Sequence, residues 1–236
     1  MPKKVLVKIY NRKYTKSSHY YLPRQSSYED VARNHLAISA DLGATNLAII
    51  NQVHGSTIID ANNLWDIGSE PDADGMYTSK KAAILGIQTA DCVPVLIASS
   101  DGDVIGAAHC GWRSAFAGIL EILVSKMRSK SNEELLAIIG PSIQMKSYEV
   151  DANFYTNFIK KSDKYGQFFI LAKDAKYLFD LPGFVAYLLK DLNVRLIKHF
   201  NDDTYQLPEL YPSYRYASHN NLGGYKGSIL STIHIK

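Results

Sequence analysis

The order of apolar and polar residues along this 236-residue chain predicts strands and helices that follow one another irregularly. Strands are predicted at residues 4–10, 47–50, 83–87, 93–98, 104–108, 135–139, 168–171, 194–200 and 229–235. Helices are predicted after the capping residues Ser27, Ser114, Asp151 and Asp180, and the first of them ends at Gly43. Residues 60–81 are rich in Asp, Asn and Gly and are expected to form a loop. The pattern indicates a mixed α/β (α+β) fold in a single domain, residues 1–236.

One hairpin can be predicted in more detail. The apolar runs 93–98 and 104–108 are separated by Ser99-Ser-Asp-Gly-Asp103, and Asp-Gly accepts the positive φ of a tight turn. Cys92 comes directly before the first arm, and His109 comes directly after the second. Antiparallel pairing therefore predicts that these two side chains meet at the open end of the hairpin.

Composition and charge narrow the class of protein. The formal net charge is only +3, and the basic residues form isolated pairs rather than a stripe, so no nucleic-acid partner is expected. No apolar run approaches the ~20 residues of a membrane-spanning helix, so no membrane partner is expected. The N-terminal residues alternate like a strand, unlike a signal peptide, and the chain has only two cysteines. We therefore expect a cytoplasmic protein with reduced thiols, while its oligomeric state is left open.

Three potential metal ligands stand at the ends of predicted strands: His54 in Asn51-Gln-Val-His-Gly55, Cys92 and His109. Zinc accepts imidazole and thiolate together, and a set of three protein ligands leaves one position for a reactant. The set therefore predicts a catalytic metal site. Each residue also has an ordinary alternative, because a lone cysteine is commonly a small buried side chain and a lone histidine a core group. Cys110 points to the strand face opposite His109 and is expected in the core.

Two aspartates are candidates for supporting such a site. Asp74, in Ala73-Asp-Gly75, or Asp91, next to Cys92, could orient a ligating imidazole through its second nitrogen. The alternative for both aspartates is ordinary turn chemistry, since aspartate side chains stabilise tight turns.

Anion binding and acid/base chemistry also have candidates. Arg113, just before a predicted helix, and Arg215, in Tyr211-Pro-Ser-Tyr-Arg215, are candidate anion-binding residues. A surface ion pair is the alternative for Arg113, and stacking on a tyrosine is the alternative for Arg215. Glu149 is a candidate acid/base group, with capping or solvation as its alternative.

Several short motifs together resemble the YfiH family. The matching segments are Asn51-Gln-Val-His-Gly55, Ala73-Asp-Gly75 with Thr78, Thr89-Ala-Asp-Cys-Val-Pro-Val95, Gly106-Ala-Ala-His-Cys-Gly-Trp-Arg113, Gly140-Pro-Ser-Ile143 with Tyr148-Glu-Val150, and Ser213-Tyr-Arg215. The chain departs from the family at Ser114, where a glycine is usual, and at Asp203-Thr204, where Cys-Thr is usual. The resemblance implies metal binding at His54, Cys92 and His109. It also implies a layered sandwich with two mixed β-sheets packed between helices.

The resemblance also implies an activity. Members of the family have been described as purine nucleoside phosphorylases with adenosine deaminase activity, as multicopper polyphenol oxidoreductases and as peptidoglycan editing factors. We therefore expect a zinc-dependent purine nucleoside phosphorylase, with a purine nucleoside and phosphate as small-molecule partners. The resemblance implies adenosine deamination as an additional activity. The residues expected to act are Cys92, His109, His54 and Arg113 in catalysis, Arg113 and Arg215 in binding substrate or phosphate, and Asp74 and Asp91 in support of the ligands.

Three other functions stay open. In a cysteine hydrolase or amidase acting on a peptidoglycan precursor, Cys92 would be the nucleophile and His109 or His54 its base. Copper in place of zinc would suit a polyphenol oxidase, although a multicopper site needs more ligands than three. A non-catalytic protein that keeps the metal for structure would be expected to provide a fourth protein ligand.

Overall fold

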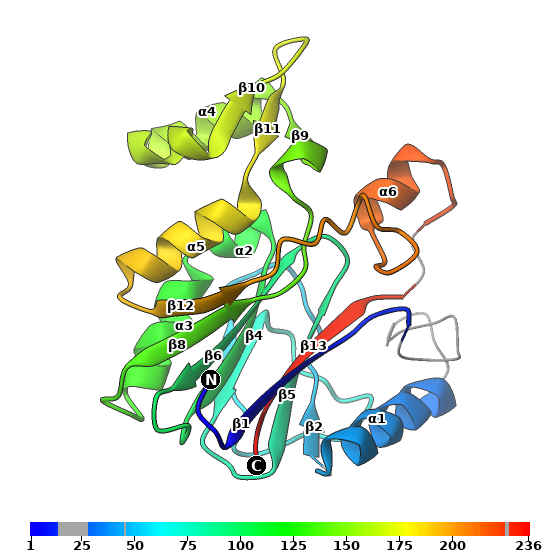
Figure 1. Ribbon diagram of the computed structural model, residues 1–236, viewed down its shortest axis with the longest axis vertical. Coiled ribbons are helices and arrows are strands. Elements are labelled where there is room, and N and C mark those ends of the chain that lie inside the picture. Colours follow the sequence, from blue (N-terminus) through cyan, green and yellow to red (C-terminus); the bar gives the residue numbers. More distant parts are fainter. Residues whose placement is uncertain (14–27, 45, 225–226) are drawn as a thin grey trace.

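The computed structural model describes residues 1–13, 28–44, 46–224 and 227–236, which form stacked layers of helices and sheets (Figure 1). The helices are α1 (Tyr28–Leu42), α2 (Trp112–Phe116), α3 (Ile119–Arg128), α4 (Ala152–Lys161), α5 (Leu181–Asp191) and α6 (Tyr214–His219). The strands are β1 (Val5–Tyr10), β2 (Asn46–Ala48), β3 (Ile58–Asp60), β4 (Gly75–Thr78), β5 (Ala83–Thr89), β6 (Val93–Ser99), β7 (Ile105–Cys110), β8 (Leu135–Ile139), β9 (Glu149–Val150), β10 (Phe169–Leu171), β11 (Tyr177–Phe179), β12 (Arg195–His199) and β13 (Ile229–Ile235). The mixed α+β class predicted from the sequence is confirmed.

Two mixed sheets form the centre of the molecule. The larger has the strand order β12-β8-β6-β7-β4-β3, with a parallel pair at each edge and antiparallel pairs between them. The smaller has the order β1-β13-β5-β2, in which only β2 and β5 run parallel. A small antiparallel sheet, β10-β11-β9, stands apart beside α4 in Figure 1. The sequence did not predict this third sheet.

Apolar side chains fill three successive layers. Helix α1 packs on the smaller sheet through residues that include Val31, Ile38, Ile84 and Leu230. The two sheets meet through residues that include Leu85, Ile87, Leu96, Ile105 and Ile233. Helices α3 and α5 cover the outer face of the larger sheet through residues that include Leu120, Leu123, Val185 and Leu189. Strands β5 and β6 are therefore covered on both faces, which explains why their sequences are apolar runs rather than alternating ones.

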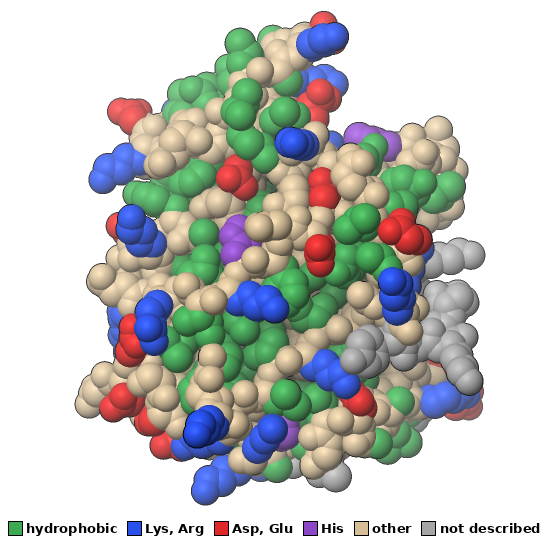
Figure 2. Space-filling view, in the orientation of Figure 1, with side chains coloured by type: hydrophobic (Ala, Val, Ile, Leu, Met, Phe, Trp, Pro, Cys, Tyr) green, Lys and Arg blue, Asp and Glu red, His purple; other side chains and the backbone are tan. Residues whose placement is uncertain are grey.

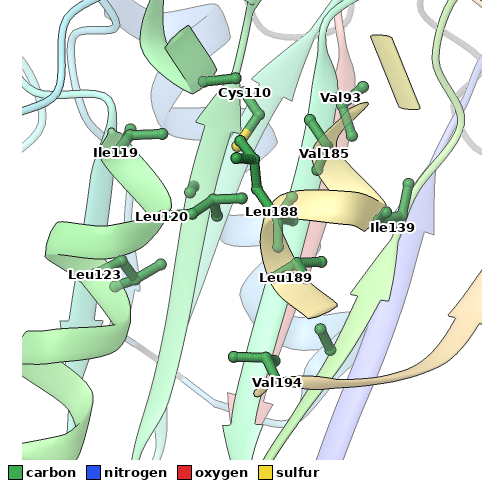
Figure 3. Close-up of a cluster of buried hydrophobic side chains, with 14 of the residues drawn as sticks. Val93, Cys110, Ile119, Leu120, Leu123, Ile139, Val185, Leu188, Leu189 and Val194 are labelled. Atoms are coloured by element: carbon green, nitrogen blue, oxygen red, sulfur yellow. The ribbon is translucent and has the colours of Figure 1, made fainter. Parts of the chain in front are cut away.

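The predicted hairpin is formed by β6 and β7. Val93 lies opposite Cys110 and Pro94 lies opposite His109, while Gly102 takes φ 74° in the turn. Cys92 and His109 therefore flank the open end, as the sequence predicted. The Cys110 side chain points the other way, into the cluster between α3 and α5, and is a core residue as expected (Figure 3).

Two predictions of local structure were wrong. Ser114 does not cap a helix, because α2 already begins after Gly111, and Gly118 with φ 88° separates α2 from α3. The stretch expected to be a loop contains β4, which is buried between β3 and β7 and so gains its strand partners from distant parts of the chain. The cap predicted at Ser27 lies outside the described residues.

Other end signals were read correctly. Asp151 accepts the Phe154 N–H at the start of α4, and Asp180 accepts the Gly183 N–H at the start of α5.

On the face shown in Figure 2, Lys and Arg side chains are scattered among acidic ones. Among the described helices, none is both long enough and apolar enough to span a bilayer.

Candidate metal centre and its cavity

Three metal-ligating side chains meet at the open end of the β6–β7 hairpin. Cys92 precedes β6, His109 lies in β7, and His54 lies in the loop between β2 and β3. Their ligand atoms lie within 4.8 Å of one another, and the two imidazole ring centroids are 4.7 Å apart. His54 is exposed, Cys92 is half-buried and His109 is 3% exposed. The fold thus brings together the three residues that the sequence singled out as ligands.

Asp74, fully buried just before β4, holds two of these three residues. Its Oδ1 lies 2.7 Å from Nδ1 of His109, and its backbone carbonyl accepts the His109 N–H at 2.7 Å. The same carboxylate accepts the backbone N–H groups of Val53, His54 and Gly55 at 3.2, 2.9 and 2.5 Å. Because Asp74 engages Nδ1 of His109, the Nε2 atom is the one left to bind a metal.

Two left-handed backbone positions shape the cluster. His54 has φ 60°, and Asp91, directly before Cys92, has φ 96°. Residues other than glycine rarely take such angles, and they persist where surrounding contacts hold them. Hydrogen bonds to Asp74 hold the backbone at His54. The backbone at Asp91 is held by the hydrogen bonds of the Asp91 side chain itself. Two of the three ligands therefore lie at or beside backbone that the fold must hold in place.

The ligands shift one another's protonation. Burial raises the pKa of the Cys92 thiol, but the neighbouring His109 and His54 outweigh it and bring the pKa down to about 7. Burial likewise lowers the pKa of His109, but Cys92 and Asp74 outweigh it and raise the pKa to about 9. For Asp74, burial raises the pKa, while the contacts with His109 and with backbone N–H groups bring it below its usual value. Without a metal, the sulfur is therefore substantially thiolate at neutral pH, the form that binds metals.

A zinc ion fits this donor set. Tetrahedral zinc holds sulfur at ~2.3 Å and nitrogen at ~2.0–2.1 Å, so donors within 4.8 Å of one another need only small shifts to share one ion. Gly111 leaves the necessary space, because a Cβ there would come 3.2 Å from Sγ of Cys92 and 3.2 Å from Cδ2 of His54. Within the described residues, no fourth protein donor joins the group. This is the pattern of catalytic zinc sites, and the same donor types also suit copper.

The three donors open into a cavity of about 620 Å³. Its wall comes from residues 50–52 and 54, from the end of β5 and its connection to β6 (residues 88–92), from the junction of β7 with α2, and from parts of the segments 143–148 and 214–215. The lining includes the aromatic residues Trp112, Tyr148 and Tyr214, the amides of Asn51, Gln52 and Gln88, and the guanidinium groups of Arg113 and Arg215. The cavity therefore combines metal donors, positive charge and aromatic surface.

Both arginines singled out from the sequence line this cavity. Arg113 is exposed, and its Cζ lies 4.8 Å from the centroid of the Trp112 ring. Arg215 is half-buried; its Cζ lies 5.2 Å from the Tyr148 ring centroid, and its Nη1 donates to the Glu149 carbonyl at 3.0 Å. Arg215 thus stacks on a tyrosine and still faces the cavity. The Glu149 carboxylate forms an ion pair with Lys176 at 2.6 Å, which matches the solvated alternative for that residue.

Asp91 has a different set of partners from Asp74. Its Oδ1 accepts the Thr204 hydroxyl at 2.7 Å, and its Oδ2 accepts the Arg215 backbone N–H at 2.7 Å. The Ser213 side chain adds a further hydrogen bond. Burial raises the pKa of Asp91, and these hydrogen bonds only partly oppose it. Of the two aspartates proposed to orient an imidazole, Asp74 contacts one, whereas the contacts of Asp91 in the described part of the chain lead to the cavity wall.

The sequence assigned no role to several residues that shape the site. Gln52 places its amide against the backbone of Gln88, donating to the carbonyl at 2.7 Å and accepting the N–H at 2.9 Å. These two hydrogen bonds follow the β2–β5 pairing at the edge of the smaller sheet, beyond the end of β2. They therefore fix the loop that carries His54. Gly111 stood in a matching motif, but its role depends on atoms gathered from three segments. Thr204 became meaningful only through its distant partner Asp91.

Comparisons with known proteins show the family to which this chain belongs. The sequence model of the family described as multi-copper polyphenol oxidoreductase laccase matches residues 13–236. A relative from Escherichia coli (strain K12), named purine nucleoside phosphorylase YfiH, is 32% identical over 70% of this chain and 67% of its own length. The chain belongs to the YfiH family. The resemblance noted in the sequence is thereby confirmed.

Other YfiH-family proteins match over nearly the full chain. A protein of Rickettsia conorii named purine nucleoside phosphorylase is 42% identical over 98% of this chain and 97% of its own length. A crystal structure of a Neisseria meningitidis protein superposes with a TM-score of 0.85 at 24% identity, covering 100% of this chain and 96% of that one. The structural likeness shows that the fold is shared. The names in the family point to two chemistries, phosphorolysis and copper oxidation.

Proposed function

We propose that this YfiH-family protein is a zinc-dependent purine nucleoside phosphorylase. The observation that carries the proposal is one cavity of about 620 Å³ that joins the donors His54, Cys92 and His109 to the guanidinium groups of Arg113 and Arg215. The names of the relatives from Rickettsia conorii and Escherichia coli support it.

The reaction sets clear requirements for the site. Phosphorolysis breaks the bond between ribose C1′ and the purine nitrogen and forms a bond between C1′ and a phosphate oxygen. The base leaves with the bonding electrons and takes up a proton. The site must therefore bind an anion, hold a flat heterocycle and stabilise the charge that develops during the transfer.

The residues of the cavity wall suit the first two requirements. Arg113 and Arg215 would bind phosphate, because guanidinium groups match the geometry of phosphate oxygens. The rings of Trp112, Tyr148 and Tyr214 provide aromatic surface for a base. Burial, followed by the nearby Cys92 charge, raises the pKa of the Tyr148 phenol. Tyr148 therefore keeps its proton and can donate a hydrogen bond in the cavity.

The metal donors suit the third requirement. His54, Cys92 and His109 would hold the ion, and Asp74 would keep His109 turned toward it. Zinc in a three-ligand site supplies Lewis-acid polarisation and an activated water near neutral pH, which is also the chemistry needed to deaminate adenosine. We therefore include adenosine deamination as a second proposed activity.

The direct test is the phosphate dependence of nucleoside cleavage. With purified zinc-loaded protein and inosine or adenosine, we expect free base and ribose 1-phosphate only when phosphate is present. Arg113→Ala and Arg215→Ala should each raise the KM for phosphate about tenfold or more, since a hydrogen bond to a charged group contributes ~1.5–3 kcal/mol. The proposal fails if phosphate does not accelerate cleavage.

A cysteine hydrolase or amidase is the second candidate. It is favoured by the Cys92 thiol, whose pKa of about 7 reflects the two adjacent imidazoles. Iodoacetamide should distinguish the two functions. If Cys92 is a zinc ligand, the loaded protein resists alkylation and the zinc-stripped protein reacts. Rapid labelling of the loaded protein, with loss of activity on a peptidoglycan fragment, would favour the hydrolase.

Copper-dependent oxidation of phenols is favoured only by the description of the family. The His54, Cys92 and His109 group could hold one copper ion, whereas a multicopper oxidase needs further clusters of ligands. A blue absorption band together with phosphate-independent oxygen uptake by the copper-loaded protein would favour this activity over phosphorolysis.

A further inference from the structure

We propose that Asp91 is a positioning residue, which holds the Arg215 wall of the cavity beside the metal centre and acts on substrate through Arg215. The inference rests on the proposed function, because it concerns the placement of an arginine proposed to bind phosphate. It assigns Asp91 to the substrate side of the site and leaves the metal ligands to Asp74.

The first argument is the place of Asp91 in the chain. It directly precedes Cys92, and its backbone takes φ 96°, an angle that only strong surrounding contacts maintain in a residue other than glycine. Its carboxylate reaches Thr204 and Arg215, which lie 113 and 124 residues further along the chain. One residue therefore joins the segment that carries a metal ligand to the segment that carries a cavity arginine.

The second argument is how firmly this contact fixes Arg215. The backbone N–H of Arg215 donates to Asp91, and its guanidinium donates to the Glu149 carbonyl, so the residue is held at both ends. Ser213, which also bonds Asp91, caps the short helix α6 by accepting the Tyr216 N–H at 3.0 Å. The Asp91 backbone carbonyl in turn accepts the Ile143 N–H at 2.9 Å. Asp91 is thus the common point of several cavity-lining segments.

The third argument is that a carboxylate is specifically required. Both oxygens of Asp91 accept hydrogen bonds, one from Thr204 and one from Arg215. An asparagine offers one neutral acceptor oxygen in place of two charged ones, so in either orientation of the amide one donor loses its acceptor, and the Arg215 N–H keeps at best a weaker bond. Asp91→Asn therefore preserves the size of the side chain and weakens the junction. His109 and the His54 loop keep their support, since they bond to Asp74, and the Asp91 carbonyl, which accepts the Ile143 N–H, still holds the backbone before Cys92.

The experiment compares zinc-loaded wild type, Asp91→Asn, Arg215→Ala and the double variant. Asp103→Asn is the matched control, because Asp103 is exposed at the opposite end of the same hairpin and pairs with Lys4. Zinc content is measured first, and the binding of inorganic phosphate and of inosine is then measured by calorimetry. We expect Asp91→Asn to keep its zinc and to bind phosphate about tenfold more weakly. In the Arg215→Ala background the same change should have no further effect, because the two residues act as one unit.

Hydrogen exchange gives a readout that needs no ligand. In Asp91→Asn the amide of Arg215 should exchange faster than in wild type, while the amide of His109, which is bonded to Asp74, should keep its rate. Thr204→Val offers a milder change if Asp91→Asn does not fold, and it should weaken phosphate binding less. This measurement tests the positioning role even if the protein binds no nucleoside.

The possible outcomes separate the two proposals. Unchanged exchange at Arg215 and unchanged phosphate binding in Asp91→Asn would overturn the positioning role. Loss of zinc in Asp91→Asn, or an additive effect in the double variant, would also overturn it. If wild type binds neither phosphate nor inosine, the phosphorylase proposal fails, and faster exchange at Arg215 would still support Asp91 as the residue that holds this wall.

Discussion

Two buried aspartates, Asp74 and Asp91, lie at the same end of the larger sheet and perform different tasks. Asp74 precedes β4 and Asp91 precedes β6, and these two strands flank β7, which carries His109. Asp74 bonds an imidazole and the loop of His54, whereas Asp91 bonds a hydroxyl and the backbone of Arg215. One carboxylate therefore organises the metal donors and the other organises the cavity wall.

The difference lies in the charge of their partners. Burial raises the pKa of both carboxyl groups, but Asp74 faces His109 and ends below the usual value, while Asp91 faces mainly neutral donors and ends above it. A buried carboxylate beside an imidazole can support a metal ligand, because its charge favours a hydrogen-bonded ring orientation. A buried carboxylate among neutral donors instead joins segments of chain. Variants at each residue should show whether the two tasks can be separated.

The largest effect is expected for the loss of a metal donor. Cys92→Ser should abolish stoichiometric zinc binding and phosphorolysis together while the protein stays folded, because serine is a poor zinc ligand. Cys110→Ala is the control, since that cysteine lies in the core and should affect stability but not zinc content. Zinc content and circular dichroism check both variants. Full zinc retention in Cys92→Ser would remove this residue from the ligand set.

Asp74→Asn should come next. Losing the charge that orients His109 and the His54 loop should weaken zinc affinity about 10–100-fold, as is typical of residues that support metal ligands. Competition with a zinc-binding dye gives the affinity. The contrast between the two aspartates requires that Asp91→Asn leave this affinity unchanged, and equal losses in both variants would remove the contrast.

Removal of the metal should have a moderate effect on stability. Bound zinc at 100 times its Kd stabilises the folded state by ~2.7 kcal/mol, which corresponds to roughly 5–10 °C in Tm for a chain of this length. Treatment with a chelator should therefore lower Tm by that order in wild type and in Asp91→Asn. Cys92→Ser should show no such decrease, and a similar decrease in that variant would place the stabilising ion elsewhere.

The smallest effect is expected at Gly111. Its φ of −64° is ordinary for any residue, so Gly111→Ala acts only through the added Cβ, which would press on Cys92 and His54. We expect zinc affinity to fall by roughly three- to tenfold, as a site loses its fit when its donors move by a few tenths of an ångström. Gly166→Ala is the matched control, because a Cβ there makes only ordinary contacts. Equal zinc affinity in both variants would show that the donors adjust freely.

The sequence predicted best what depends on neighbours in the chain. The β6–β7 hairpin followed from two apolar runs and Asp101-Gly102, and it placed Cys92 near His109. The strand β13 and the cap at Asp151 followed in the same way from local pattern. The ligand set was proposed from residue types at strand ends and from the family motifs.

What could not be predicted depends on contacts between distant segments. Nothing near Asp91 in the sequence indicates Thr204 as its partner, since only the folded chain brings the two together. Strand β4 gains its burial from β3 and β7, although its surroundings in the sequence are typical of a loop. Likewise, a glycine is needed at Gly111 because of side chains that come close to it only in the folded chain.

The unequal exposure of the three donors has a consequence for the traffic of ions. His54 is the outermost donor and belongs to a loop, whereas Cys92 and His109 are fixed at a strand start and within a strand. An incoming ion would therefore reach His54 first, and while the loop stays closed a departing ion would keep this ligand until last. The rate of metal exchange would then depend on how often the hydrogen bonds from the loop to Asp74 break, while the sheet itself stays intact.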